Sequence, residues 1–113
     1  MTIKETNFEQ IQGDKWDTYI VLTDQNGLVD FTGYTFQMQV RDKEGGSNLC
    51  ATASLDDGIT VTGLGTIYVK LTGAKTAKFN TPKSKYQIVS INPSGDKETL
   101  IQGWFDVTPN VVA

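Results

Sequence analysis

Residues 11–41 read IQGDKWDTYIVLTDQNGLVDFTGYTFQMQVR, and the pattern within this stretch decides the fold class. The segment Lys15–Thr23 is rich in aromatic and β-branched residues, which suit a pleated, half-buried strand. Asp24–Gly27 then supplies turn-forming residues, and Gly27 accepts a positive φ at little cost. In Thr35–Arg41 apolar and polar residues alternate throughout, so one face of this strand is predicted to meet a core and the other to meet water. The stretch therefore predicts a β-sheet with one buried face.

Short strand-like segments separated by turn signals continue along the rest of the chain. This spacing favours a sandwich or barrel over a helical or α/β fold, and the strands are expected to pair in antiparallel fashion. A loop tip is expected at Gly45–Asn48, and at most one short helical turn near residues 73–79 (GAKTAKF), before Pro82. The expected strands are Asn7–Gln12, Lys15–Thr23, Thr35–Arg41, Leu49–Ser54, Ile59–Thr62, Thr66–Thr72, Lys85–Asn92 and Thr99–Thr108.

Alternation also predicts which side chains point inward. One core is expected to contain Phe36, Met38, Ile67, Val69, Leu71 and Phe105. In the last strand, Ile101, Phe105 and Val107 share the inward face, which leaves Leu100, Gln102, Trp104 and Asp106 on the outward one. Lys15–Thr23 is apolar on both faces, a property of strands that are central in a sheet or covered by another chain.

Length and composition limit the possible classes of protein. A chain of 113 residues is expected to form one domain, residues 1–113. The net charge of -3 and the absence of a Lys/Arg run argue against nucleic-acid binding. No apolar run reaches the roughly 18 to 20 residues that span a bilayer, and no signal-peptide core is present, so a cytoplasmic protein is expected. The single Cys50 cannot form an intrachain disulfide and is expected to be a small buried hydrophobe.

Catalytic and metal-binding residue types are scarce. Because the chain has no histidine and one cysteine, the commonest general base and the usual zinc ligand sets are missing. The thirteen Asp and Glu residues lie mostly in turns or on polar faces, so we expect no enzyme, no cofactor and no metal site. The turn at Asp24 lacks the spacing of a calcium loop, and Asp56-Asp57-Gly58 is ordinary turn chemistry, although a cation there stays a second interpretation.

Aromatic residues on outward faces are the best candidates for a binding surface. Tryptophan and tyrosine are enriched at the centres of protein interfaces, so a protein-protein contact surface is expected. The alternative is a carbohydrate-binding module in which flat rings stack on sugars. The candidate interface residues are Trp104, Gln102, Asp106, Tyr68, Tyr19 and Val21.

Four motifs support a comparison with a known family. They are IQGD at residues 11–14, LTD followed by Gly27, DFTGYTFQMQVR at residues 30–41, and the closing IQG at residues 101–103 with Phe105, Val107 and Pro109. Together they resemble small tail and baseplate proteins of bacteriophages and prophages, in particular the immunoglobulin-like (Ig-like) N-terminal domain of phage baseplate upper proteins.

This resemblance implies an Ig-like β-sandwich that serves as a structural piece of a virion. It also implies contacts with other phage structural proteins, several copies or a homo-oligomer in each particle, and assembly in the bacterial host cytoplasm. It supplies no catalytic or cofactor residues. Because the sequence ends at Ala113, a free-standing adaptor, a fibre-anchoring protein or a decoration protein is expected.

Overall fold

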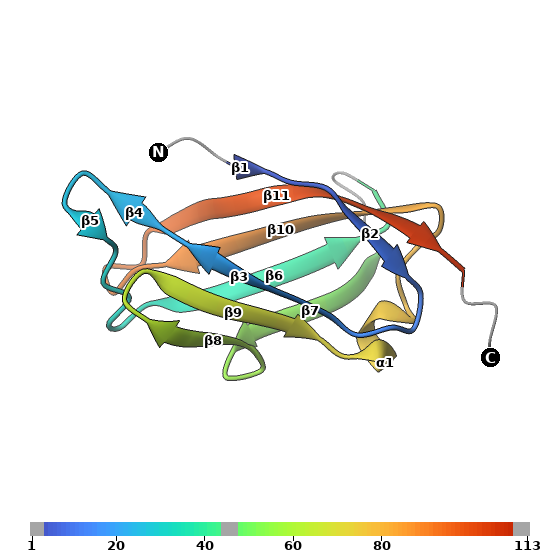
Figure 1. Ribbon diagram of the computed structural model, residues 1–113, viewed down its shortest axis with the longest axis horizontal. Coiled ribbons are helices and arrows are strands. Elements are labelled where there is room, and N and C mark those ends of the chain that lie inside the picture. The colour runs from blue at the N-terminus through green and yellow to red at the C-terminus, as the bar shows by residue number, and fades with distance from the viewer. Residues whose placement is uncertain (1–3, 44–47, 110–113) are drawn as a thin grey trace.

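Strands dominate the structure, a computed structural model that describes residues 4–43 and 48–109 (Figure 1). The strand expected at Thr35–Arg41 has these bounds in the structure, whereas most of the loop expected at Gly45–Asn48 lies outside the described residues. The elements in chain order are β1 (Lys4–Glu5), β2 (Phe8–Ile11), β3 (Trp16–Val21), β4 (Thr23–Asp24), β5 (Gly27–Leu28), β6 (Thr35–Arg41), β7 (Leu49–Leu55), β8 (Gly58–Gly63), β9 (Thr66–Leu71), α1 (Gly73–Thr76), β10 (Lys83–Ile91) and β11 (Lys97–Thr108).

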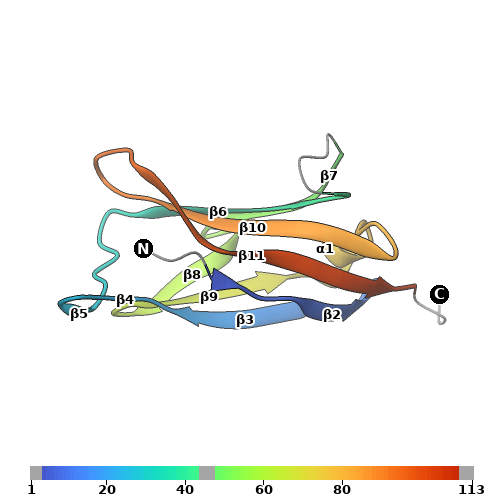
Figure 2. The same ribbon diagram turned by 90° about the horizontal axis from the view of Figure 1, so that it is seen from above.

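The main strands form two layers. Hydrogen bonding runs in the order β1-β11-β10-β6-β7-β8-β9-β3, and β2 also pairs with β11. Seen from above, β6, β10 and β11 make one layer and β3, β9 and β8 make the other (Figure 2). The chain passes between layers where β7 leads into β8, through a turn in which Asp56 has a φ of 65°. The molecule is an Ig-like β-sandwich, as the sequence predicts.

Most strand pairs are antiparallel, but three are not. Strands β1 and β2 both pair with β11 in parallel, and β7 pairs with β8 in parallel. The antiparallel expectation omitted these pairs: β1 and β2 lie far from β11 in the sequence, and a turn such as Asp56-Asp57-Gly58 was not expected to leave the strands on its two sides parallel. The close approach of the N-terminal segment to β11 depends on Gly103, where a Cβ atom would overlap the Thr6 carbonyl oxygen.

The predicted core is confirmed by burial. Phe36, Met38, Ile67, Val69, Leu71 and Phe105 are all at most 2% exposed. The two inner faces meet around Phe105, whose ring lies 4.8–5.7 Å, between centroids, from those of Phe8, Trp16, Phe79 and Tyr86. This aromatic cluster joins both layers and the segment after α1.

The predicted facing of Leu100 is wrong. Ile88 pairs with Ile101 but the next residue, Val89, pairs with Thr99, so Leu100 is an extra residue in β11. Such a β-bulge interrupts the alternation of faces. As a result Leu100 and Ile101 are both buried, at 4% exposed each.

The expected helical turn is present and shorter than the 73–79 segment. Its Thr76 hydroxyl is buried, donates to the Asp14 carbonyl oxygen at 2.6 Å and accepts from the Gly13 N–H at 3.1 Å. These contacts attach α1 to the turn between β2 and β3. Within residues 4–43 and 48–109, no helix is long and apolar enough to cross a membrane.

Candidate functional site: two separate outer faces

The candidate interface residues lie on two faces that point away from each other. Gln102, Trp104 and Asp106 alternate along β11, on the outer side of the β6-β10-β11 layer. Tyr19, Val21 and Tyr68 lie on β3 and β9, on the outer side of the other layer. The core separates the two groups, so they cannot form one binding surface. In particular, Trp104 cannot join the two tyrosines in a single sugar-stacking platform, as the carbohydrate hypothesis required.

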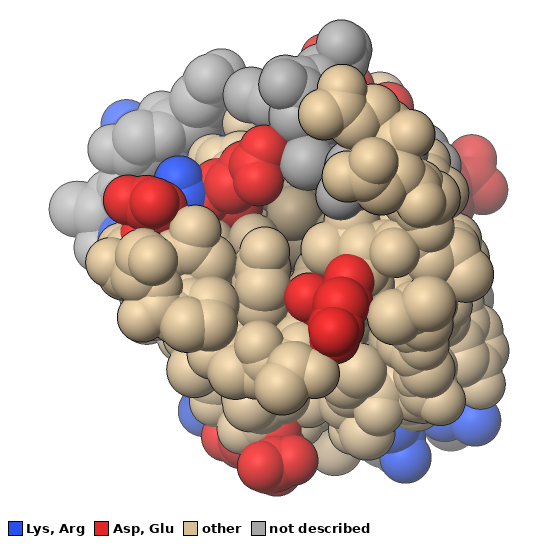
Figure 3. Space-filling model, turned by 90° about the vertical axis from the view of Figure 1, so that its left-hand side faces the viewer, with Lys and Arg blue, Asp and Glu red and all other residues tan. Residues whose placement is uncertain are grey.

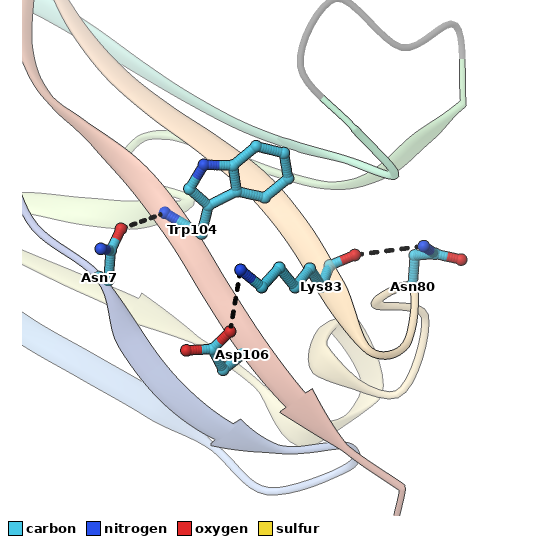
Figure 4. Close-up of polar contacts among 5 residues, drawn as sticks. All are labelled: Asn7, Asn80, Lys83, Trp104 and Asp106. Carbon is cyan, nitrogen blue, oxygen red and sulfur yellow. Dashed lines mark hydrogen bonds and ion pairs between the residues drawn. The ribbon is translucent and has the colours of Figure 1, made fainter.

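Trp104 faces outward but is covered by its own neighbours. Its backbone N–H donates to Asn7 Oδ1 at 2.9 Å (Figure 4). The Nζ atoms of Lys83 and Lys85 lie 5.8 and 5.1 Å from the ring centroid. Lys85 is the residue opposite Trp104 in the ladder, and Lys83 pairs with Asp106 at 3.8 Å. Cations over an indole ring are favourable contacts. The half-buried Trp104 therefore already has partners within the chain, which weakens the reason for expecting another protein to cover it.

The face around Trp104 also gathers charges that are dispersed in the sequence. A shallow pocket of about 290 Å³ lies on it. Because β6 and β10 are paired in register, residues about 45 positions apart in the chain become neighbours, a clustering that a search for Lys/Arg runs missed. The pocket is lined by Gln39, Arg41, Lys43, Lys85, Tyr86, Gln87 and Gln102.

The outer face of β3 and β9 is the more apolar surface. Tyr19 is 64% exposed and Val21 is 60% exposed, the largest exposures among the big hydrophobic residues that the structure describes. Tyr19 lies opposite Tyr68 in the ladder, with 4.8 Å between ring centroids. The Tyr68 hydroxyl donates to Asp17 Oδ2 at 2.7 Å, and this hydrogen bond is the main reason why the pKa of Tyr68 is raised. Tyr68 is thus held in place as a fixed neighbour of Tyr19. We call Tyr19, Val21 and Tyr68 the tyrosine face.

Carboxylates at the loop end of the sandwich are spread apart rather than convergent. Figure 3 looks onto this end of the molecule, where Asp and Glu side chains occur at several separate places and some lie beside a basic side chain. A hollow of about 500 Å³ is lined in part by Asp30 and Asp56. Asp30 accepts hydrogen bonds from the hydroxyl and the N–H of Thr32, at 2.7 and 3.0 Å, and these bonds lower its pKa. Among the described residues, no group of three Asp, Glu, Cys or His side chains could hold a metal ion.

Two smaller expectations concern Cys50 and Asp57. Cys50 is half-buried and contacts the core from its margin, so the expectation of a buried thiol is wrong.

Asp57, one member of the candidate cation turn, pairs with Lys75 at 3.6 Å. Lys75 also donates to the Thr52 carbonyl oxygen at 2.8 Å, so Lys75 links α1 both to β7 and to the turn that follows it.

Comparison with known proteins gives structural neighbours only. No protein-family model matches the chain, and no curated protein sequence matches it. A solved structure from photo-crosslinking analyses of multimeric cell-adhesive interactions of voltage-gated sodium channel β subunits superposes with a TM-score of 0.51. It is 14% identical, and the match covers 92% of each chain. A parallel homodimer of the extracellular domain of the voltage-gated sodium channel β4 subunit gives a TM-score of 0.47 at 12% identity, covering 98% of this chain and 97% of that one.

The structure that superposes with a TM-score of 0.51 corrects the phage resemblance. The first neighbour is an Ig-like domain of a cell-adhesion protein, not a tail or baseplate protein, so the assignments to a phage family and to a virion are wrong. At 14% identity the likeness shows the fold alone. The motifs that suggested phage proteins combine strand alternation with turn residues, and any Ig-like sandwich can contain this combination.

Proposed function

We propose that this Ig-like sandwich is a non-enzymatic domain that works through protein-protein contacts, and that the tyrosine face is its contact surface. One observation carries the proposal: Tyr19 and Val21 lie side by side on one face and are each at least 60% exposed. Adjacent apolar side chains that face water in this way mark interaction sites on soluble domains. Multimeric adhesive contacts in the first structural neighbour support the same kind of role.

The arrangement of the face suits a protein partner. Tyrosine offers a large apolar area with few rotatable bonds, which makes it a frequent anchor in interfaces. Asp17 and Lys70 are opposite each other at one end of the face and supply polar groups at its margin. The rim of a non-obligate interface is usually polar in this way.

Photo-crosslinking in the cells that produce the protein tests the proposal. A benzoylphenylalanine residue replaces Tyr19 in one variant and Gln87, on the opposite outer face, in a matched control. We expect a discrete crosslinked product from position 19, which Val21→Lys in the same chain abolishes, and no product from position 87. A discrete product from position 87 alone would place the contact surface on the Trp104 face and contradict the proposal.

A further inference from the structure

The described strand order ends at β3, so one long side of this strand has no neighbouring strand within residues 4–43 and 48–109. The orientation of its backbone follows from its other side. The Leu22 N–H donates to the Gly65 carbonyl oxygen at 2.7 Å, and in an antiparallel ladder alternate residues bond to the same neighbour. Residues 16, 18, 20 and 22 therefore bond toward β9. The N–H and C=O groups of Asp17, Tyr19 and Val21 point toward the open side.

This edge lacks two of the features that normally prevent strand addition, proline and a β-bulge. It contains no proline, and its pairing with β9 runs without a register shift from Trp16 to Val21. The one charged side chain of β3, Asp17, lies near one end of the strand and accepts a hydrogen bond from the Tyr68 hydroxyl. Beside the edge lies a groove of about 310 Å³, bounded on its far side by Thr6, Phe8, Leu100 and Ile101. The groove leaves space next to the edge.

We propose that a second copy of this chain occupies the edge, with the two β3 strands paired antiparallel about a two-fold axis at Tyr19. The inference goes beyond the proposed function: it assigns a second copy to the open edge of β3, which borders the tyrosine face. A two-fold axis makes the edge complementary to itself, because each of the three open residues both donates and accepts. The two sheets then become one, and Tyr68 and Tyr19 of each copy form a continuous row of four tyrosines on its outer face.

Charge favours this register over its neighbours. With Tyr19 opposite Tyr19 of the other copy, each Asp17 lies opposite Val21, and the two Asp17 residues are about 14 Å apart along the strands, at about 3.4 Å per residue. Shifting the strands until the two Asp17 residues are opposite each other would bring like charges together, which is destabilising. A parallel arrangement in register would do the same. The antiparallel pair centred on Tyr19 avoids both.

Two variants at one position distinguish edge pairing from contact through the face. Val21→Pro removes an N–H and blocks the edge, while the bonds to β9 come from residues 20 and 22 and are retained. Val21→Thr keeps the N–H and removes apolar character from the face. In sedimentation velocity across a concentration series, we expect a dimer for the parent chain and for Val21→Thr. Val21→Pro should weaken dimerisation by about tenfold or more, as expected for two lost hydrogen bonds.

A folding control and a cysteine-pairing control accompany the sedimentation measurement. Circular dichroism should show Val21→Pro folded, whereas Ile20→Pro, which interrupts the ladder with β9, should lower the melting temperature sharply. In a Cys50→Ser background, Tyr19→Cys should form a disulfide dimer on mild oxidation and Val21→Cys should not, because only position 19 lies opposite itself. A parent chain that stays monomeric, or a dimer equally strong in Val21→Pro and Val21→Thr, overturns the edge pairing. A crosslink from position 19 to another protein would then still support the proposed function.

Discussion

Truncation of Phe105 to alanine should remove much of the stability of the sandwich. The side chain is fully buried, and its ring contacts four other aromatic rings that come from β2, β3, β10 and the segment after α1. Replacing a buried phenylalanine by alanine costs about 3–5 kcal/mol, and the cost is highest where the surroundings cannot collapse into the cavity. Because the four neighbouring rings are held by separate elements, we expect a value in the upper half of that range.

A loss of this size is large compared with the total. Domains of this kind are stable by about 5–15 kcal/mol, and an unfolding entropy of about 2.1 cal/mol/K per residue converts the loss into a fall of roughly 15–20 °C in Tm. Differential scanning calorimetry of Phe105→Ala measures the shift, with Trp104→Ala as the matched control one position away on the outer face. The control loses partial burial and two lysine contacts, and its Tm should fall by about 4 °C, corresponding to about 1 kcal/mol. Equal shifts in the two variants would refute the assigned facing of β11.

Three further outcomes follow from single contacts. Thr76→Val should lower the free energy of unfolding by about 1–3 kcal/mol in urea titrations, because the Gly13 N–H loses its acceptor; no change would mean that water replaces the hydroxyl. Gly103→Ala should cost about 1–3 kcal/mol and speed hydrogen exchange around Thr6, since the new Cβ overlaps that carbonyl oxygen; unchanged exchange would contradict the close packing of β1. Burial raises the pKa of Tyr86 above its usual value of 10.0, so stability should fall as the pH rises above about 10, where the unfolded state ionises first. Tyr86→Phe should reduce that alkaline loss, measured by urea unfolding at pH 7 and 10.5, whereas Tyr19→Phe should not.

The sequence predicts the fold well where one rule governs a segment. In β6 every second residue is buried, as strict alternation requires, and the strand bounds match. The turn prediction also depends only on local sequence and is confirmed: Gly27 has a φ of 110° at the turn between β4 and β5. The prediction for Leu100 failed because a bulge depends on how β10 and β11 pair, and a single strand does not encode that pairing. Local rules therefore predict elements but not the register between them.

The candidate site was less predictable for the same reason. Outward residues could be recognised on each strand, but only the pairing of strands shows that Tyr19 lies beside Tyr68 and that Trp104 lies in the opposite layer. The lysine contacts to Trp104 depend on β10 being in register with β11. Alternation alone therefore overestimated the exposed surface of Trp104, and with it the need for another protein to cover the ring.

The predicted position of β3 in the sheet differs from the position that the structure shows. Its two apolar faces indicated a strand that is central or covered, yet in the structure it is an edge with Tyr19 and Val21 exposed. The expectation follows from the hydrophobic effect: an apolar strand face that remains in water does not contribute the stabilising free energy that its burial would provide. A strand added beside β3 would make it central in its sheet but would leave Tyr19 and Val21 in water. The disagreement between pattern and position is therefore an argument that a partner covers the tyrosine face, as the proposed function requires, and it is independent of the pairing proposed for the edge.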